Sequence, residues 1–224
     1  MHVARQEEWS KVLKELDAEN LKPMSYDNTL VPLLGNVRGK KILDYGAGPG
    51  VLALGLQRLG ADVKIWDINP EMREEAEQKI GSGNVYHFLE DIPCGFFDFV
   101  ICNLVLCIVP EVEVQNILRN IAFMLNDHGQ AFIGFCNPLI FQIEETQLNL
   151  RFPTEHTYEE NHDYRKIKKE GGYTIIESHR PIAWYEKIFR DAEFRILGEH
   201  FTPEYELKGK KIRDFVIFQL EKAK

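Results

Sequence analysis

The 224-residue sequence lacks an apolar segment long enough to cross a membrane. Its longest apolar run, Phe99 to Val109, is interrupted by Asn103 and falls short of the roughly 20 residues that a spanning helix needs. We expect this run to be a buried strand leading into a loop, and we expect no membrane partner. Residues 1–8 contain no apolar stretch of the kind found in secretory signals, so the expected location is cytoplasmic.

Cysteines are few, and none are arranged as a CxxC pair. Cys94, Cys102, Cys107 and Cys136 lie in or beside apolar stretches. This distribution predicts reduced, buried thiols in a cytoplasmic protein and excludes a disulfide scaffold.

Basic residues are also in deficit, with 27 Lys and Arg against 35 Asp and Glu and a net charge of -8. Proteins that bind nucleic acid through phosphate contacts usually have the opposite balance, so a nucleic-acid partner is not expected. Lys166, Lys168, Lys169 and the cluster at 208–211 could touch an anionic substrate, or they could be solvated surface charges. The hydrophobic share of 44% is ordinary for a globular domain with a sizeable core.

What the sequence does contain is an alternation of short apolar runs and amphipathic stretches. An N-terminal helix is expected at 5–16, where Trp9 is either a core residue or part of a lid. The central part predicts strands at 41–45, 62–67, 84–89, 97–103 and 130–135, with helices at 52–59, 70–80 and 114–125 and a turn at 127–129. A helix at 181–189 and two strands at 194–201 and 212–220 follow. Such alternation predicts right-handed crossovers and a parallel sheet, with the last two strands as an antiparallel pair at one edge.

The run Gly46-Ala47-Gly48-Pro49-Gly50 follows the first of these strands and precedes a helix. Glycines at such a turn let the backbone approach a ligand closely. Asp67 ends the next strand, about 20 residues later, where a carboxylate accepts hydrogen bonds from ribose hydroxyls. Alternatively, Asp67 caps the helix that begins at Pro70. The pair predicts an adenosine-containing cofactor, but Val51 departs from the dinucleotide pattern and weakens a nicotinamide oxidoreductase interpretation.

Four ordered segments resemble the motifs of class I S-adenosylmethionine-dependent methyltransferases of the small-molecule type. The segment 43–50 resembles the first motif, 66–72 the second, 90–92 the loop that contacts adenine, and 97–106 the fourth motif. The resemblance covers residues 39–136 and extends more weakly to 179–194. It implies a doubly wound, Rossmann-like α/β fold with seven strands in the order 3-2-1-4-5-7-6, strand 7 antiparallel, and helices on both faces.

The resemblance also implies roles for individual residues in binding S-adenosylmethionine and its product, S-adenosylhomocysteine. Glycines 46, 48 and 50 with Ala47 would line the methionine part, Asp67 would bind the ribose, and Asn103 and Leu104 would lie near the methionine ammonium. Ile68 and Ile92 would flank the adenine and Asp91 would accept from its amine, although Asp91 could be an ordinary loop acid. Asp44 would act on the ammonium through water or hold the turn.

The expected organisation is a single methyltransferase domain with four parts. These are an N-terminal helical extension or lid (1–38), a cofactor-binding core (39–136), a substrate-capping insertion (137–178) and a C-terminal helix with a hairpin (179–224). The insertion is long for a connection, which is typical of a functional loop or small subdomain.

The expected reaction is in-line transfer of a methyl group to an O, N or C nucleophile of a small molecule. His179 is the preferred general base, because it precedes a helix at the open edge of the sheet; a surface or core histidine is the alternative. Tyr26, His156, Tyr158, His162 and Tyr164 are candidates on the acceptor side. The motif for adenine amine methylation is absent after the fourth strand. Metal-dependent catechol methylation needs acidic metal ligands at the same place, where this chain has Cys102 and Asn103, so no metal is predicted. A tRNA or protein substrate and a non-catalytic, cofactor-binding partner subunit remain alternatives. Neither the acceptor nor the oligomeric state follows from the sequence.

Overall fold

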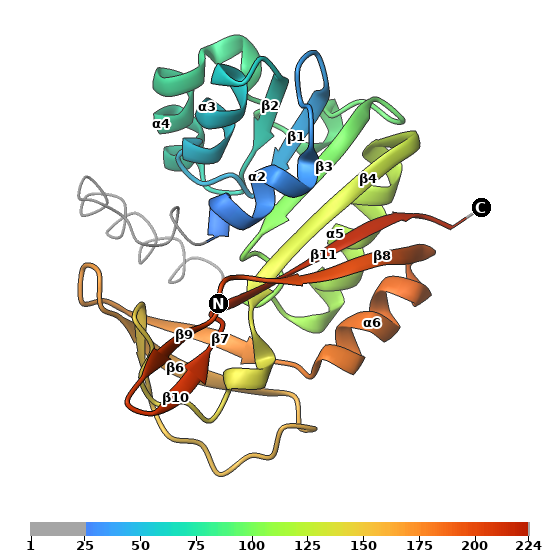
Figure 1. Cartoon of the computed structure of the whole chain (residues 1–224). Coiled ribbons are helices and arrows are strands. Elements are labelled where there is room, and N and C mark those ends of the chain that lie inside the picture. Colours follow the sequence, from blue (N-terminus) through green and yellow to red (C-terminus); the bar gives the residue numbers. More distant parts are fainter. Residues whose placement is uncertain (1–25, 224) are drawn as a thin grey trace.

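The computed structural model describes residues 26–223 (Figure 1). The helix expected at 5–16, with Trp9, lies outside this range. The helices are α2 (Asn28–Leu34), α3 (Val51–Arg58), α4 (Pro70–Ile80), α5 (Glu111–Met124) and α6 (Ile182–Asp191), with short 3-10 turns η2 (Ser82–Asn84), η3 (Leu89–Asp91) and η4 (Pro138–Ile140). The strands are β1 (Lys41–Tyr45), β2 (Asp62–Trp66), β3 (Phe97–Asn103), β4 (Leu125–Cys136), β5 (Asn149–Arg151), β6 (His162–Lys168), β7 (Thr174–His179), β8 (Phe194–Phe201), β9 (Tyr205–Leu207), β10 (Lys210–Ile212) and β11 (Phe215–Lys222). None of the helices within the described range combines the length and the apolar character needed to span a membrane.

The main sheet has six strands in the order β2-β1-β3-β4-β11-β8. Strands β1 to β4 are parallel, and β11 runs antiparallel between β4 and β8, as expected for the penultimate position in the order. The expectation of seven strands is wrong because the segment 84–89 forms only one isolated bridge, between Val85 and Ile65. The turns η2 and η3 flank this segment, so too few residues remain for a ladder.

Alternate residues of the central strands enter two separate cores, one on each face of the sheet. Leu43, Val100 and Ile133 pack with α5 and α6 in one core. Ile42, Ile101 and Phe132 belong to the other core, with residues of α2, α3 and α4. Helices therefore cover both faces, and the carboxyl ends of β1, β3 and β4 lie together at one edge of the sheet.

Some sequence expectations change in detail. Residues 127–129, expected to form a turn, are instead part of β4. The register of the pairing between β4 and β3 shifts there, between Phe97 and Phe99 of β3. The strand expected at 212–220 divides into β10 and β11, because β10 leaves the main sheet to pair with β9. The four cysteines are free thiols, but Cys94 is exposed rather than buried, since it lies in the turn before β3.

The segment expected to be an insertion folds as a separate three-stranded antiparallel sheet, β5-β6-β7, which we call the cap sheet. Figure 1 places it beyond the lower end of the main sheet, where β4 runs into η4. A hydrogen bond of 2.7 Å from the Ser178 N–H to the Cys107 carbonyl fastens β7 to the loop that follows β3. The cap sheet is thereby held beside the carboxyl ends of the parallel strands.

Candidate functional site

Residues 46–50 form a tight turn between β1 and α3. Gly46, Gly48 and Gly50 have φ angles of 74°, 57° and 72°, in the left-handed region that glycine adopts at least cost. The Gly46 N–H donates to the Trp66 carbonyl at 2.7 Å, which fastens the turn to the end of β2. A Cβ at Gly48 would meet no atom within 4 Å, so the backbone there faces open space and can be approached closely by a ligand.

Asp67 joins the glycine turn to the loop after β2. Its Oδ2 accepts the Gly48 N–H and its Oδ1 accepts the Asn69 N–H, both at 2.8 Å. Burial raises the pKa of this carboxyl, although the two N–H groups oppose the shift. Helix α4 is capped by the Asn69 side chain, which accepts the Glu71 N–H, so Asp67 is not needed as the cap. Each Asp67 oxygen keeps acceptor capacity for a ligand hydroxyl beside the open turn, an arrangement that fits an adenosine cofactor.

Tyr26, Asn103 and Asp44 gather where β1 and β3 end. The Tyr26 hydroxyl donates to Asn103 Oδ1 at 2.5 Å. Burial, with a contribution from the Asp44 charge, raises the Tyr26 pKa well above 10, so the phenol remains a donor. The ring lies edge-on to Phe215, with centroids 5.3 Å apart. Tyr26 is therefore a core residue whose hydroxyl reaches the strand ends.

Close packing at Gly134 makes room for this tyrosine. A Cβ at Gly134 would lie 1.4 Å from Tyr26 Oη, so Gly134→Ala must displace the ring and break its bond to Asn103. We expect the free energy of unfolding, measured by urea denaturation, to fall by about 1–3 kcal/mol. In the control Gly55→Ala, within α3, the new Cβ meets nothing within 4 Å and should stabilise by about 0.5–1 kcal/mol. If the Gly134→Ala protein were as stable as the wild type, the close contact between Gly134 and the Tyr26 hydroxyl would be contradicted.

His179 ends β7 and is 3% exposed. Its Nε2 lies 2.8 Å from the Tyr158 carbonyl oxygen, an acceptor, so Nε2 carries the proton and Nδ1 keeps its lone pair. Burial lowers the pKa of this imidazole, as do the neighbouring His162 and Arg151, against the Tyr158 hydrogen bond. A neutral imidazole with a free basic nitrogen is suited to accepting a proton.

The other acceptor-side candidates from the insertion lie around His179. The His162 ring stacks between those of His156 and His179, with centroid separations of 4.4 and 4.9 Å. Tyr158 accepts the Ile182 N–H at the start of α6. His156 is exposed, and of these residues only Tyr164 and His179 reach the small cavity described below.

The residues expected near the adenine are spread over two loops. Ile68 is 68% exposed beside Asp67, and Asp91 is exposed in η3. Ile92, the residue after η3, is buried in the core that contains residues of α5. Leu104 has a positive φ of 59° and is held by its N–H to the Gly134 carbonyl at 2.7 Å. Their roles toward a cofactor stay predictions.

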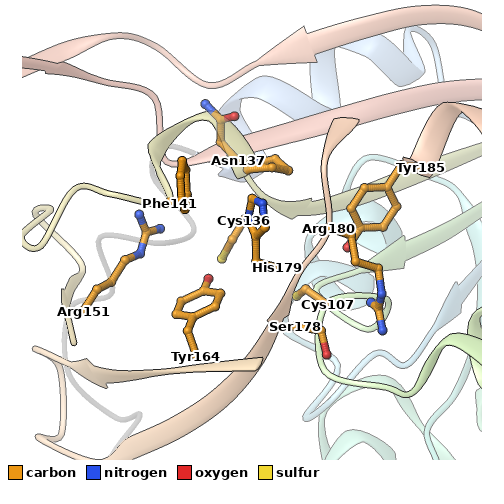
Figure 2. Close-up of a pocket in the computed structure, with 11 residues that line it drawn as sticks. Cys107, Cys136, Asn137, Phe141, Arg151, Tyr164, Ser178, His179, Arg180 and Tyr185 are labelled. Carbon is orange, nitrogen blue, oxygen red and sulfur yellow. The ribbon is translucent and has the colours of Figure 1, made fainter. Parts of the chain in front are cut away.

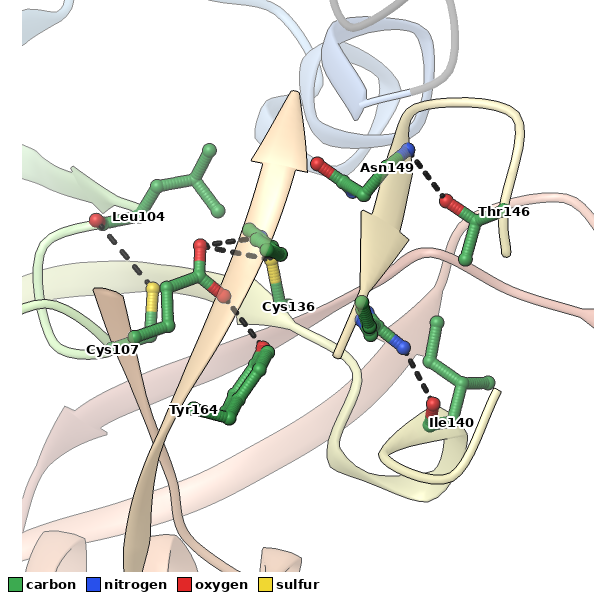
Figure 3. A network of polar contacts seen from close by, with 10 residues as sticks. Leu104, Cys107, Cys136, Ile140, Thr146, Asn149 and Tyr164 are labelled. Atoms are coloured by element: carbon green, nitrogen blue, oxygen red, sulfur yellow. Dashed lines mark hydrogen bonds and ion pairs between the residues drawn. The ribbon is translucent and has the colours of Figure 1, made fainter. Parts of the chain in front are cut away.

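Sequence reasoning missed a buried polar network beneath the cap sheet (Figure 3). Lys166, expected as a solvated charge, is fully buried and forms an ion pair with Glu177. Tyr164 donates to Glu177 Oε2 at 2.7 Å, and the Lys166 ammonium lies 3.1 Å from Cys136 Sγ. Burial raises the pKa of the Glu177 carboxyl, but Lys166 outweighs this effect and brings it from 4.5 to about 2. The alternation of polar residues at 162, 164, 166 and at 177, 179 indicates that they share a face, but it does not show that this face is buried.

A cavity of about 10 Å³, room for about one water molecule, lies between the cap sheet and the end of β4. Arg151, Tyr164 and His179 reach it from β5, β6 and β7 (Figure 2). Cys136, at the end of β4, and Cys107, in the loop after β3, also line it. The cavity thus lies between the cap sheet and the segments that follow β3 and β4.

Comparison with known proteins agrees with this arrangement. A family profile described as "Methyltransferase domain" matches residues 2–178. The ubiquinone biosynthesis O-methyltransferase of Shewanella halifaxensis is 27% identical over 158 residues, which are 67% of this chain and 66% of that protein. The enzyme of the same name from Xanthomonas euvesicatoria is 32% identical over 132 residues, 55% of this chain and 53% of that protein. The matches therefore span less than two thirds of these relatives' own length.

A solved structure shares the fold over nearly the whole chain. It is the 1,6-didemethyltoxoflavin-N1-methyltransferase of Burkholderia thailandensis, with bound 1,6-didemethyltoxoflavin and S-adenosylhomocysteine. The TM-score is 0.62 at 15% sequence identity, and the match covers 100% of this chain and 90% of that one. At this identity the likeness concerns the fold alone.

Proposed function

Because this chain belongs to the class I S-adenosylmethionine-dependent methyltransferases, we propose that it transfers a methyl group from this cofactor to a nucleophilic O, N or C atom of a small molecule. The observation that carries the proposal is the bond from the Gly48 N–H to Asp67 Oδ2, which fixes a carboxylate beside an open glycine turn. The relatives named for ubiquinone biosynthesis, and the solved structure with its bound toxoflavin precursor, support a small acceptor.

The chain's own residues divide the work of cofactor binding. The backbone at 46–50 would hold the methionine part, Asp67 the ribose hydroxyls, and Asn103 the ammonium group. Ile68, Ile92 and Asp91 would surround the adenine. When bound, the cofactor supplies a sulfonium-activated methyl group for in-line displacement.

The cap sheet would position the acceptor and exclude water, and such alignment is worth about 7–11 kcal/mol in related bimolecular reactions. His179 Nδ1 would take the proton of an acceptor that arrives protonated, since Nε2 is already committed to the Tyr158 carbonyl. The acceptor's lone pair forms the new bond to the methyl carbon while the sulfur–carbon bond breaks. S-adenosylhomocysteine is the other product.

Cofactor binding can be tested by calorimetric titration of S-adenosylmethionine into the wild type and into Asp67→Ala. Hydrogen bonds to a charged group contribute roughly 1.5–3 kcal/mol, so the variant should bind about ten- to a hundredfold more weakly. Glu71→Ala is the matched control, because Glu71 is an exposed acid on the first turn of α4 and its side chain should not affect affinity. A wild type that does not bind the cofactor would indicate a degenerate site or one completed by a partner, and it would refute the proposal.

A further inference from the structure

The buried, inner face of the cap sheet is mostly polar. Its inner face carries Arg151, Tyr164, Lys166, Glu177 and His179, all turned toward the main sheet or the cavity. Leu150 and Ile176, on the alternate face, are 41% and 40% exposed. Burying charged groups is costly. The polar inner face of this sheet therefore indicates that its side chains contact polar groups enclosed beneath the sheet.

Lys166 and Glu177 satisfy one another on this inner face. The Lys166 ammonium contacts both the Glu177 carboxylate and Cys136 Sγ. The second Glu177 oxygen accepts the Tyr164 hydroxyl. The single negative charge of the buried carboxylate is therefore balanced by Lys166 and does not neutralise a second cation.

Arg151 is that second cation, and it is 6% exposed. One of its donors, Nη1, reaches the Ile140 carbonyl at 2.5 Å, and its guanidinium lies 5.9 Å from the centre of the Tyr164 ring. Its Nε is buried with no hydrogen-bond partner, and no carboxylate of residues 26–223 is within ion-pair distance. A buried guanidinium donor without a partner is costly, so the Arg151 Nε–H is available to an acceptor atom of a bound molecule.

The cavity places this guanidinium close to the proposed chemistry. Arg151 and His179 line the same small space, together with Cys107 and Cys136 (Figure 2). An acceptor atom bound at Arg151 would therefore lie in the cavity that His179, the proposed base, also lines. The cavity volume of about 10 Å³ is that of about one water, so it admits one carboxylate oxygen rather than a whole substrate.

We propose that the methyl acceptor is a small organic acid whose carboxylate binds Arg151. The planar guanidinium offers parallel N–H donors that match a carboxylate. Phe141, whose ring lies 4.9 Å from that of His179, gives the cavity an aromatic wall. This inference rests on the proposed function, because it identifies the acceptor class of the same site.

The test compares acids with their neutral amides, using the full-length protein saturated with S-adenosylhomocysteine. Acetate, phenylacetate and benzoate are titrated calorimetrically beside acetamide, phenylacetamide and benzamide. At least one acid should bind ten- to a hundredfold more tightly than its amide, as expected for about one charged hydrogen-bonded pair. Arg151→Met should remove this preference and Arg151→Lys should restore part of it. Arg165→Met, which removes an exposed arginine from the adjacent strand, should leave it unchanged.

The outcomes separate the two proposals. If S-adenosylhomocysteine fails to bind the wild type, the methyltransferase proposal itself is wrong. If it binds and no acid is preferred over its amide, only the Arg151 proposal is overturned. The wild-type comparison decides this even if Arg151→Met does not fold. An acid preference that survives in a folded Arg151→Met protein also overturns it.

Discussion

Replacing His179 with alanine should lower the methyl-transfer rate by about 10²–10⁴-fold, the usual contribution of a general base, and leave the affinity for S-adenosylmethionine unchanged. The Tyr158 carbonyl fixes the proton on Nε2, so Nδ1 is the nitrogen that can accept a proton. Single-turnover rates with an acceptor found by screening, together with calorimetric Kd values, measure the two quantities separately. An unchanged rate would remove His179 as a base.

The pH profile distinguishes a base from a structural histidine. Burial, His162 and Arg151 lower the pKa of His179 below 6.5, so the imidazole becomes a competent base already below that pH. The acidic limb of the rate profile should therefore lie below 6.5 in the wild type and disappear in His179→Ala. His156→Ala is the matched control, because this exposed histidine belongs to the same ring stack but does not line the cavity. The His156→Ala protein should keep both the wild-type methyl-transfer rate and the acidic limb of the pH profile.

Replacing Lys166 with methionine should destabilise the protein by about 3–5 kcal/mol, because it leaves the Glu177 carboxylate buried without its ammonium partner. Urea denaturation at neutral pH measures the loss. Lys187→Met provides the control, since the Lys187–Asp191 pair on α6 is exposed and such pairs contribute little. If Lys166→Met and Lys187→Met lowered the free energy of unfolding equally, the buried Lys166–Glu177 pair would contribute no more than an exposed one.

The same pair predicts a pH dependence of stability. The Glu177 pKa is lowered from 4.5 to about 2, so its contribution is complete above 4.5 and is lost as the pH falls through about 2. In Lys166→Met the largest lowering contribution is lost, and only Lys168 and the Tyr164 hydroxyl still oppose the raising effect of burial on the Glu177 pKa. The stability difference between the two proteins should therefore narrow as the pH is reduced from 4.5 toward 2. The double variant Lys166→Met/Glu177→Gln should recover part of the loss at neutral pH.

The central sheet could be predicted from the sequence because its strands are buried on both faces and read as short apolar runs. The bounds of β3 and β8 match the expected ranges 97–103 and 194–201. The failure at 84–89 has a specific cause. Val85 and Tyr86 have strand-like side chains, but the turns on either side leave only one bridge to Ile65, a limit set by tertiary geometry rather than by local preference.

Part of the candidate site could be predicted because the order of the strands alone places its residues together. The glycine turn and Asp67 lie at the ends of adjacent strands, and the topology alone brings them within hydrogen-bond distance. The cap sheet is different, because its strands alternate charged and polar residues, a pattern typical of a solvated surface. Only the packing of that polar face against η4 and the end of β4 shows that Lys166 and Arg151 are buried. No local pattern contains that information.

The position of β11 governs the order in which this fold can be completed. This strand fills the gap between β4 and β8, so the sheet stays in two pieces until residues 215–222 have been synthesised. Until then β4 has an unpaired edge with apolar side chains such as Ile133 and Phe135, a surface on which nascent chains associate. Pairing of β4 with β11 joins segments about 80 to 90 residues apart, and pairing over such separations is intrinsically slow. We therefore expect association of nascent chains to compete with folding until β11 has paired with β4.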